Sequence, residues 1–155
     1  MARVAVALGS NLGDREAALQ FAIDRLTQFV SDLTISNFIE TDPEGEGLQD
    51  QPRYINAAVV GETALSAREV LDNLLSIERA YGRERPHPNA ARTLDLDLIL
   101  LGDVIEDLPD LRVPHPRFRE RLFVLEPLAE VAPDMIDPVT GIAVAELLRQ
   151  LEGKR

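Results

Sequence analysis

The sequence of 155 residues contains no cysteine, and nowhere do about 18 apolar residues follow one another. The lack of cysteine excludes disulfide bonds and thiolate metal sites. The lack of a long apolar run argues against a membrane-spanning helix. The first apolar segment, Val4 to Leu8, is too short for a secretory signal peptide. We therefore expect a cytoplasmic protein with one domain over residues 1–155 and no membrane partner.

Lysine is almost absent as well, since Lys154 is the only lysine among 16 basic residues. Half of the basic residues are arginines between positions 79 and 121, a stretch with as many carboxylates, so the flanks carry the whole net charge of −11. A planar guanidinium suits bidentate phosphate binding, whereas a nucleic-acid binder is basic overall. We therefore expect a small phosphorylated ligand and no nucleic acid. Plain surface charge is the alternative interpretation of each single arginine.

The phosphate-binding pattern GxxxxGK[ST] is missing too, which excludes a P-loop. The run GSNLGD at residues 9–14 resembles a phosphate-binding loop at the start of a helix. Taken alone, this signal is weak. A turn followed by a helix N-cap is the simpler interpretation.

Hydrophobic periodicity predicts an α+β fold. Strands are expected at residues 3–8, 33–39, 54–62 and 93–101, and helices at 14–30 and 66–81. This order is that of a ferredoxin-like sandwich, with a largely antiparallel four-stranded core sheet covered by helices. Further helical segments are expected around residues 119–131 and 144–151.

Single residues mark the expected helix ends. Asp14 can cap the first helix, and Ser66 with Glu69 forms a capping box for the second. Gly82 is expected to end that second helix. Two long loops remain, at 41–53 and 83–92. The first exceeds about 12 residues, and loops of that length are often functional. The acidic surface favours a monomer.

The strongest local signal is the run RTLDLDLILL at residues 92–101. Side chains alternate along a strand, so Asp95 and Asp97 share one face, which continues into Ile99 and Leu101. The leucines at even positions from 94 to 100 are expected on the other face. Aspartate is disfavoured in strands, and two neighbouring carboxylates repel unless a cation neutralises them. The pair therefore predicts a magnesium or manganese site completed by phosphate oxygens and water, with a solvated polar face as the alternative.

Basic residues flank this pair along the chain. Arg83, Arg85 and Arg92 precede it, and Arg112, His115 and Arg121 follow it. Metal-binding carboxylates flanked by arginines are typical of phosphoryl transfer, because cation and arginines stabilise charge on the transferred group. Read alone, a single histidine between two prolines is more often structural.

Five segments together resemble one enzyme family. They are GSNLG, DQPRYINAA, SIERAYGRER, RTLDLDLILLG and VPHPRFRERLFVLEPL. In this order and near this spacing they are similar to 6-hydroxymethyl-7,8-dihydropterin pyrophosphokinase, over roughly residues 4 to 133. The resemblance implies an ATP-dependent diphosphokinase on a ferredoxin-like core. It would transfer pyrophosphate from ATP to the pterin hydroxymethyl group and release AMP, a step of folate biosynthesis.

The resemblance also implies which residues serve the nucleotide and the metal. Asp95 and Asp97 match aspartates that hold two magnesium ions between ATP and the pterin hydroxyl. The arginines that resemble those closing over the phosphates are Arg83, Arg85 and Arg92. The residues that resemble the ATP-binding set are Glu78, Arg112, His115 and Arg121. Without the family, Glu78 reads as an exposed helix carboxylate.

A second set is implied for the pterin. Asn56 and Asp95 match residues at the pterin amide edge, and Tyr54 and Phe123 are available for the ring. The segment Thr41, Asp42 and Pro43 matches a loop whose backbone contacts the pterin. Tyr54 and Phe123 are equally plausible as plain core residues.

The chain departs from the family pattern in two places. Residues 88–92 read PNAAR, where many family members carry an aromatic residue that stacks on the pterin. Closure of this loop would then depend on His87, the prolines or the arginines. Before the first loop, Ile39 and Glu40 replace an aromatic-basic pair.

Two other function classes remain open from the sequence. A nucleotidyl transferase can use the same Asp-x-Asp pair on a related fold, but it would release pyrophosphate in place of AMP. A non-catalytic ligand-sensing or interaction domain would show no magnesium-dependent nucleotide binding. A third possibility is a pseudoenzyme of the same family, which binds ATP but has lost pterin binding through the altered loop.

Overall fold

The computed structural model describes residues 1–42, 53–84 and 94–154. Its centre is an antiparallel sheet in the order β2-β4-β1-β5, with β3 also paired to β4. The strands are β1 (Ala2–Ser10), β2 (Ser31–Ile35), β3 (Ile39–Thr41), β4 (Tyr54–Thr63) and β5 (Asp95–Leu101). Helix α1 (Arg15–Leu26) follows β1, and α2 (Ala67–Glu84) follows β4. This topology confirms the predicted ferredoxin-like α+β fold.

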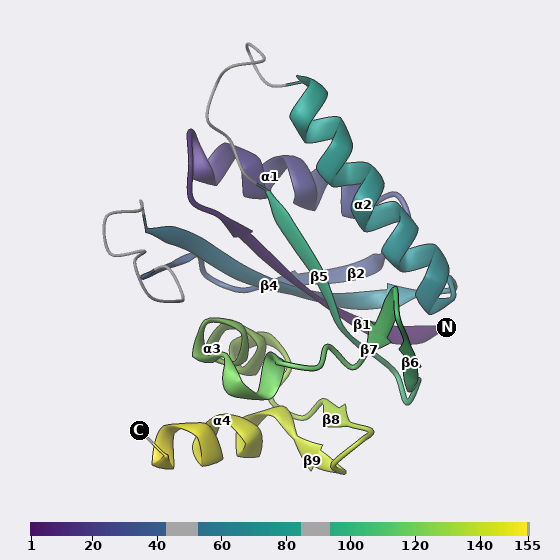
Figure 1. Cartoon of the computed structure of the whole chain (residues 1–155), viewed down its shortest axis with the longest axis vertical. Coiled ribbons are helices and arrows are strands. Elements are labelled where there is room, and N and C mark those ends of the chain that lie inside the picture. The colour runs from purple at the N-terminus through teal and green to yellow at the C-terminus, as the bar shows by residue number, and fades with distance from the viewer. Residues whose placement is uncertain (43–52, 85–93, 155) are drawn as a thin grey trace.

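Helices cover both faces of this sheet (Figure 1). Helices α1 and α2 lie on one face, and α3 (Leu122–Val131) and α4 (Val144–Gly153) lie on the other. A short 3₁₀ helix, η1 (Phe118–Glu120), precedes α3. Two small hairpins complete the described chain, β6 (Glu106–Leu108) with β7 (Leu111–Val113) and β8 (Ile136–Asp137) with β9 (Ile142–Ala143). In the described residues, no helix is long and apolar enough to cross a membrane.

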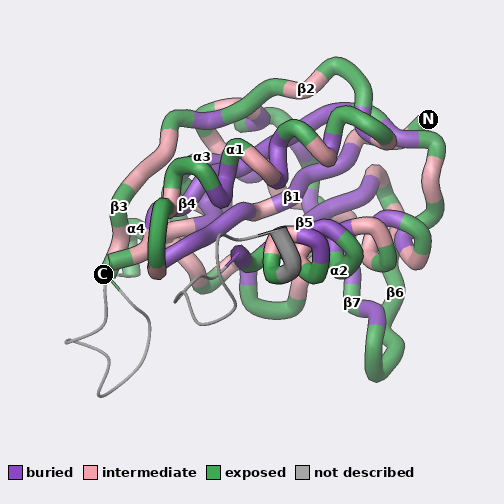
Figure 2. Tube along the Cα trace, turned by 90° about the horizontal axis from the view of Figure 1, so that it is seen from above, coloured by how far each residue is buried: buried purple, intermediate pink, exposed green. Residues whose placement is uncertain are grey.

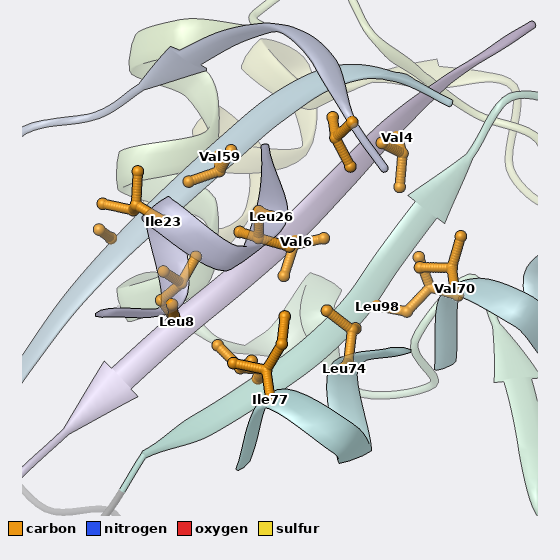
Figure 3. Close-up of a cluster of buried hydrophobic side chains, with 14 of the residues drawn as sticks. Val4, Val6, Leu8, Ile23, Leu26, Val59, Val70, Leu74, Ile77 and Leu98 are labelled. Carbon is orange, nitrogen blue, oxygen red and sulfur yellow. The ribbon is translucent and has the colours of Figure 1, made fainter. Parts of the chain in front are cut away.

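Two hydrophobic cores result, one on each face of the sheet. Alternate residues of β1 divide between them, because Val4, Val6 and Leu8 join the core under α1 and α2, whereas Ala5 joins the core under α3 and α4. Figure 3 shows part of the first core, and Figure 2 shows the buried residues running along the inner strands. Each fully buried leucine or valine contributes roughly 1.5–3 kcal/mol, so both cores hold the sheet in place.

A β-bulge at Ile99 breaks the expected alternation of β5. The pairing with β1 shifts between Ala5, which faces Leu100, and Val6, which faces Leu98. Ile99 and Leu100 therefore both enter the core under α3, and Leu101 enters the core under α2. The prediction that Leu100 shares a face with the earlier even-numbered leucines was wrong, because a bulge inserts one extra residue and reverses the alternation after it.

The strand predicted at 33–39 is two short strands, β2 and β3. Ser36 lies at the break between β2 and β3, where its side-chain hydroxyl takes the place of a backbone acceptor for β4. Its hydroxyl accepts a hydrogen bond from the Ala58 backbone N–H (2.9 Å), while its own N–H donates to the Ala58 carbonyl (2.9 Å). A serine hydroxyl can satisfy a strand donor in this way, so the chain bends without leaving a buried polar group unpaired.

The predicted helix starts are confirmed, but two predicted ends are wrong. The Asp14 carboxylate accepts a hydrogen bond from the Ala17 N–H (3.1 Å). Ser66 and Glu69 exchange the two bonds of a capping box. Helix α1 ends at Leu26 and not near residue 30. Helix α2 continues through Gly82 to Glu84, because one glycine costs a helix only about 1 kcal/mol.

The segment predicted as one helix near 119–131 is η1 followed by α3, with Arg121 in an extended conformation between them. Arg119 is anchored there by the carboxylate of Asp137, which is fully buried. The distances are 2.5 Å from Nε to Oδ2 and 2.9 Å from Nη2 to Oδ1. This bidentate pair holds the β8–β9 hairpin against η1.

Candidate active site

A cavity of about 480 Å³ opens at the end of the sheet where β1 finishes and β5 begins. Its lining residues come from four strands, from α2 and from α3 and its neighbouring segments. They are Ala7, Gly9, Asn11, Thr41, Asp42, Tyr54, Asn56, Glu78, Asp95, Asp97, Arg121, Phe123 and Val124. The cavity therefore brings together residues that are more than 110 positions apart in the sequence.

The strand pairing places the polar groups of this cavity in a row. Gly9 of β1 lies opposite Asp95 on one side and opposite Asn56 on the other. Ala7 lies opposite Asp97. A Cβ atom on Gly9 would lie 2.9 Å from Oδ1 of Asn56, which is too close for a side chain without displacement. Small residues on β1 thus leave the space between the aspartates and Asn56 open.

Asp95 and Asp97 lie on adjacent outward positions of β5 and both line the cavity. Burial by the surrounding protein and the charge of Asp97 raise the pKa of Asp95, while a hydrogen bond from the Tyr54 hydroxyl lowers it. A bound cation would relieve the repulsion between the two carboxylates.

The donor set fits a magnesium ion that is shared with a substrate. In the described part of the chain, no group of three or more His, Asp or Glu side chains is arranged to hold a metal ion. Two carboxylates alone leave most of an octahedron to water and phosphate oxygens, which is how Mg²⁺ is usually held beside nucleotides. The structure therefore fits an ion carried in with a phosphorylated ligand better than a closed structural site.

Tyr54 and Asn56, on the same side of β4, are fixed by side-chain hydrogen bonds. The Tyr54 hydroxyl donates to Asp95, and burial, the Asp95 charge and this bond raise the pKa of Tyr54. The Asn56 amide donates from Nδ2 to the Thr41 hydroxyl. Both side chains line the cavity, so the interpretation of Tyr54 as a plain core residue is wrong.

Glu78 reaches from α2 to the edge of the sheet. Its Oε2 accepts a 2.7 Å hydrogen bond from the backbone N–H of Leu96, the residue between the two aspartates. Burial raises the pKa of Glu78, the bond from Leu96 lowers it, and the charges of Asp95 and Asp97 raise it further. Glu78 is thus half-buried beside the site, and its interpretation as an exposed helix carboxylate was wrong.

The wall formed by α3 supplies an aromatic ring and a cation. Phe123 lines the cavity, as does Arg121, which immediately precedes α3. The guanidinium carbon of Arg121 lies 5.5 Å from the centroid of the Phe123 ring, within the range of a cation–π interaction. Phe123 packs partly against the second core and also faces the cavity.

A second cavity of about 280 Å³ lies beside the first. Asp97 lines both cavities. The second is lined by residues of α2, β5, the β6–β7 hairpin and the following segment: Leu71, Leu96, Asp97, Leu98, Pro109, Asp110, Leu111, Arg112, His115 and Pro116. The four residues predicted to bind ATP are thus divided, with Glu78 and Arg121 in the first cavity and Arg112 and His115 in the second.

The bulge at Ile99 holds His115 in this wall. The carbonyl of Ile99 accepts a 3.0 Å hydrogen bond from the His115 backbone N–H. The imidazole Nδ1 accepts from the Arg117 N–H (3.2 Å). Burial lowers the pKa of His115, the charge of Asp97 raises it, and Arg121 and Arg117 lower it. The imidazole is therefore neutral near pH 7, with Nε2 left to carry its proton.

Residues 5–133 match the 7,8-dihydro-6-hydroxymethylpterin-pyrophosphokinase (HPPK) family. The chain belongs to this family. It is 41% identical over 148 residues to a 2-amino-4-hydroxy-6-hydroxymethyldihydropteridine pyrophosphokinase of Pseudomonas aeruginosa, covering 94% of this chain and 90% of the relative. It is 44% identical over 128 residues to the Bacillus subtilis protein of the same name, covering 81% and 75%.

Solved structures show the same fold at lower sequence identity. A wild-type Plasmodium falciparum HPPK-DHPS crystal structure matches with a TM-score of 0.74 at 13% identity. An HPPK-DHPS in complex with substrates matches with a TM-score of 0.78 at 11% identity. The match covers 99% of this chain in both cases, and this chain spans 45% and 44% of those longer chains.

Nine of the residues predicted to form the site line the first cavity. The cavity brings together Glu78, Asp95, Asp97, Arg121, Thr41, Asp42, Tyr54, Asn56 and Phe123. Pro43, Arg85 and Arg92 lie outside the described residues, as do the side chain of Arg83 and residues 87–91 of the divergent loop. Ala7 and Val124 were not predicted to line the site, and Gly9 and Asn11 were noted only as part of a weak phosphate-loop signal. The GSNLG segment contains Gly9 and Asn11, and the alternation of side chains along β1 places Ala7 on the same face as Gly9.

Proposed function

We propose that this chain is an ATP-dependent diphosphokinase that transfers pyrophosphate from ATP to the hydroxymethyl group of 6-hydroxymethyl-7,8-dihydropterin. The products are AMP and the pterin diphosphate, and the reaction is a step of folate biosynthesis. The observation that carries the proposal is that Asp97 lines two adjacent cavities. One carboxylate thus faces the junction where two substrates would meet.

Asp95 and Asp97 would hold Mg²⁺, and we expect two ions shared with the triphosphate. When bound, such ions neutralise phosphate charge and lower the pKa of a coordinated hydroxyl. Tyr54 orients Asp95 by its hydrogen bond. Glu78 fixes the backbone between the two aspartates at Leu96, so the spacing of the carboxylates is set by the protein before any substrate binds.

The second cavity would take the nucleoside end of ATP, with its phosphates directed towards Asp97. Arg112 and His115 line that cavity, and Arg121 lines the first near the same aspartate. A guanidinium suits phosphate oxygens, and the free Nε2–H of a neutral histidine can donate to one. The three arginines that we expect to close over the phosphates are Arg83, Arg85 and Arg92. Arg92→Ala would then slow turnover more than it weakens pterin binding.

The first cavity would take the pterin. Asn56 and Asp95 carry amide and carboxylate groups that can pair with the donors and acceptors of the pterin edge. Phe123 and Tyr54 offer ring surfaces. The segment Thr41, Asp42 and Pro43 would border the same substrate, with Thr41 and Asp42 lining the cavity.

The reaction is an in-line displacement at phosphorus. The pterin hydroxyl oxygen forms a bond to the β-phosphorus of ATP, and the bond from that phosphorus to the oxygen bridging the α- and β-phosphates breaks. AMP leaves with the bridging oxygen, and the hydroxyl proton passes to solvent. Catalysis then depends mainly on positioning and on stabilisation of phosphate charge by Arg121 and by the cations that the aspartates would hold.

We further propose that residues 1–155 form one domain, that the protein is a cytoplasmic monomer, and that it binds no nucleic acid. The net charge of −11 supports the last two points, because a strongly acidic chain repels nucleic acid and other copies of itself. Size-exclusion chromatography with light scattering would test the oligomeric state.

The decisive experiment incubates the purified chain with Mg²⁺, ATP and 6-hydroxymethyl-7,8-dihydropterin and quantifies the products by chromatography. Equal, magnesium-dependent amounts of AMP and pterin diphosphate are expected. Release of pyrophosphate in place of AMP would indicate a nucleotidyl transferase. ATP binding without AMP formation would indicate a changed acceptor. No magnesium-dependent ATP binding would exclude the kinase and favour a ligand-sensing domain.

A further inference from the structure

Arg15, the first residue of α1, joins the two strands that border the pterin end of the first cavity. Its Nη1 atom donates to Oε1 of Glu40 on β3 (3.0 Å) and to the backbone carbonyl of Arg53 just before β4 (2.8 Å). The side chain of Arg15 is 29% exposed, so water only partly screens these contacts. One guanidinium therefore connects α1, β3 and β4.

Two further contacts extend this cluster. Arg53 donates from Nη2 to the carbonyl of Glu40 (3.4 Å), and its Nε atom lies 3.2 Å from Oδ1 of Asp42. We call Arg15, Glu40, Asp42 and Arg53 the stem cluster, because Asp42 and Arg53 are the last and first described residues on either side of residues 43–52. It contains two ion pairs, Arg15 with Glu40 and Arg53 with Asp42, so its net charge is zero.

The position of Arg15 is unfavourable for the helix by itself. A cation in the first turn of a helix faces the positive end of the helix dipole and costs about 0.3–1 kcal/mol. Asp14 caps this helix, and Glu16 supplies the acid of its first turn. An arginine at an electrostatically unfavourable position in its own helix suggests that it serves tertiary contacts. Here those contacts are the hydrogen bonds to Glu40 and to the backbone of Arg53.

The stem cluster is directly connected to the cavity. Glu40 precedes Thr41, Arg53 precedes Tyr54, and Thr41 and Tyr54 are paired across β3 and β4. Thr41 accepts the hydrogen bond from Asn56, and Tyr54 donates to Asp95. A change in the spacing of β3 and the start of β4 would therefore move two side chains that line the cavity.

We propose that Arg15 is a positioning residue for the pterin, acting through Glu40 and the backbone of Arg53. Arg15 is not among the described residues that line the cavity, so it sets the substrate's surroundings without touching the substrate. This proposal rests on the proposed function, because it assigns the end of the cavity near Thr41 and Tyr54 to the pterin.

The test compares Arg15→Met with the parent protein. Methionine keeps much of the length of the side chain and removes both hydrogen bonds. We expect the Kd of the pterin, measured by calorimetry with a non-hydrolysable ATP analogue and Mg²⁺, to rise about three- to tenfold. The Kd of the analogue measured alone should stay within about twofold. Equal weakening of both ligands, or no change in either, would overturn the proposal.

Three variants keep the result interpretable. Glu40→Gln removes the charged acceptor and leaves the Arg15–Arg53 bond, so a smaller rise in the pterin Kd is expected. The double variant Arg15→Met/Glu40→Gln should be no worse than Arg15→Met, because both changes break one contact; additive losses would contradict a shared role. Arg149→Ala breaks an exposed pair with Glu146 on α4 and should leave both Kd values unchanged.

A conservative variant separates positioning from stability. Arg15→Lys retains the charge beside Glu40 and should recover part of the pterin affinity even if its melting temperature equals that of Arg15→Met. Recovery that only follows the melting temperature would assign Arg15 a purely structural role. If the parent protein itself makes no AMP from ATP and pterin, the proposed function fails, whatever the variants do.

Discussion

The Glu78 carboxylate accepts a hydrogen bond from the Leu96 N–H at 2.7 Å, and Leu96 lies between the two aspartates of the site. Strand β5 is last in the strand order of the sheet, so its outer N–H groups need partners from elsewhere. Glu78 supplies one from α2. The same bond ties the helix on one face to the strand that carries the carboxylates, and it places a third negative charge near them.

Glu78→Ala should therefore destabilise the fold as well as the site. The Leu96 N–H would lose its acceptor, at a cost of about 1–3 kcal/mol. Glu78→Gln keeps an acceptor oxygen and should lose less. Urea unfolding of the three proteins measures this difference. Equal stability of the alanine variant and the parent would mean that the bond contributes nothing.

Asp97→Ala should nearly abolish turnover and leave the fold intact. Asp97 lines both cavities and is only half-buried, so its loss leaves no apolar void. Removal of one metal-binding carboxylate is expected to lower kcat by more than about 10²-fold. AMP production and circular dichroism check the two statements. A variant that keeps more than about a tenth of the parent rate would not be compatible with this role.

Gly9→Ala should weaken pterin binding specifically. The added Cβ would lie 2.9 Å from Oδ1 of Asn56, so the amide must move from its place beside Thr41. We expect the Kd of the pterin to rise about tenfold, equivalent to ~1.4 kcal/mol. The Kd of an ATP analogue serves as the internal reference, and parallel changes in both would point to general distortion.

In contrast to Gly9→Ala, Gly82→Ala should stabilise the protein. Apart from its own helix backbone, a Cβ at Gly82 meets no atom of the described residues within 4 Å, and the residue lies inside α2. Alanine in a helix is about 0.5–1 kcal/mol more favourable than glycine, so this variant should be more stable than the parent. A lower melting temperature would show that α2 requires a glycine here.

The Arg119–Asp137 pair predicts a component of acid unfolding. Burial acts to raise the pKa of Asp137, but hydrogen bonds from Arg119, Thr140 and Val139 outweigh it, and the pKa lies below 3.8. The folded protein thus binds this proton less tightly than the unfolded chain does. Ionised Asp137 contributes stability above pH 3.8 that is lost as the pH falls through the lower folded pKa.

Asp137→Asn should cost about 2–4 kcal/mol at pH 7, and the difference from the parent should shrink below pH 3.8. Unfolding free energies measured across this range check the prediction. Asp134→Asn is the matched control, because Asp134 is largely exposed and its partner Arg3 is partly exposed, and such pairs contribute little. A difference for Asp137→Asn that does not depend on pH would contradict the assigned ionisation.

Parts of the site and of the fold were predictable from sequence where their signal lies in residues close together along the chain. The Asp95 and Asp97 pair conflicts with strand propensity, and the Ser66 and Glu69 capping box is a local signal, so both could be found by counting along the chain. The fold class followed from the order of strands and helices. These features depend on short-range spacing only.

Several missed features depend on contacts between distant elements. The bulge at Ile99 comes from the fit of β5 to β1, and the Ser36 break comes from its bonds to Ala58. Glu78 was assigned to the site only by the family resemblance, because its partner is a backbone N–H that carries no sequence signal. Arg15 gave only a weak hint, its unfavourable place at a helix start.

Because of the bulge at Ile99, the number of residues in β5 matters more than which apolar residues it contains. Before the bulge, odd positions face α3 and even positions face α2; after it, Leu101 faces α2. The extra residue also presents the Ile99 carbonyl that holds His115. If one residue were lost here, either the aspartates would leave the cavity or Leu101 would leave the core under α2. Exchange of one leucine for another apolar residue would have neither effect. Among relatives, this strand should therefore vary in its apolar side chains but not in its length.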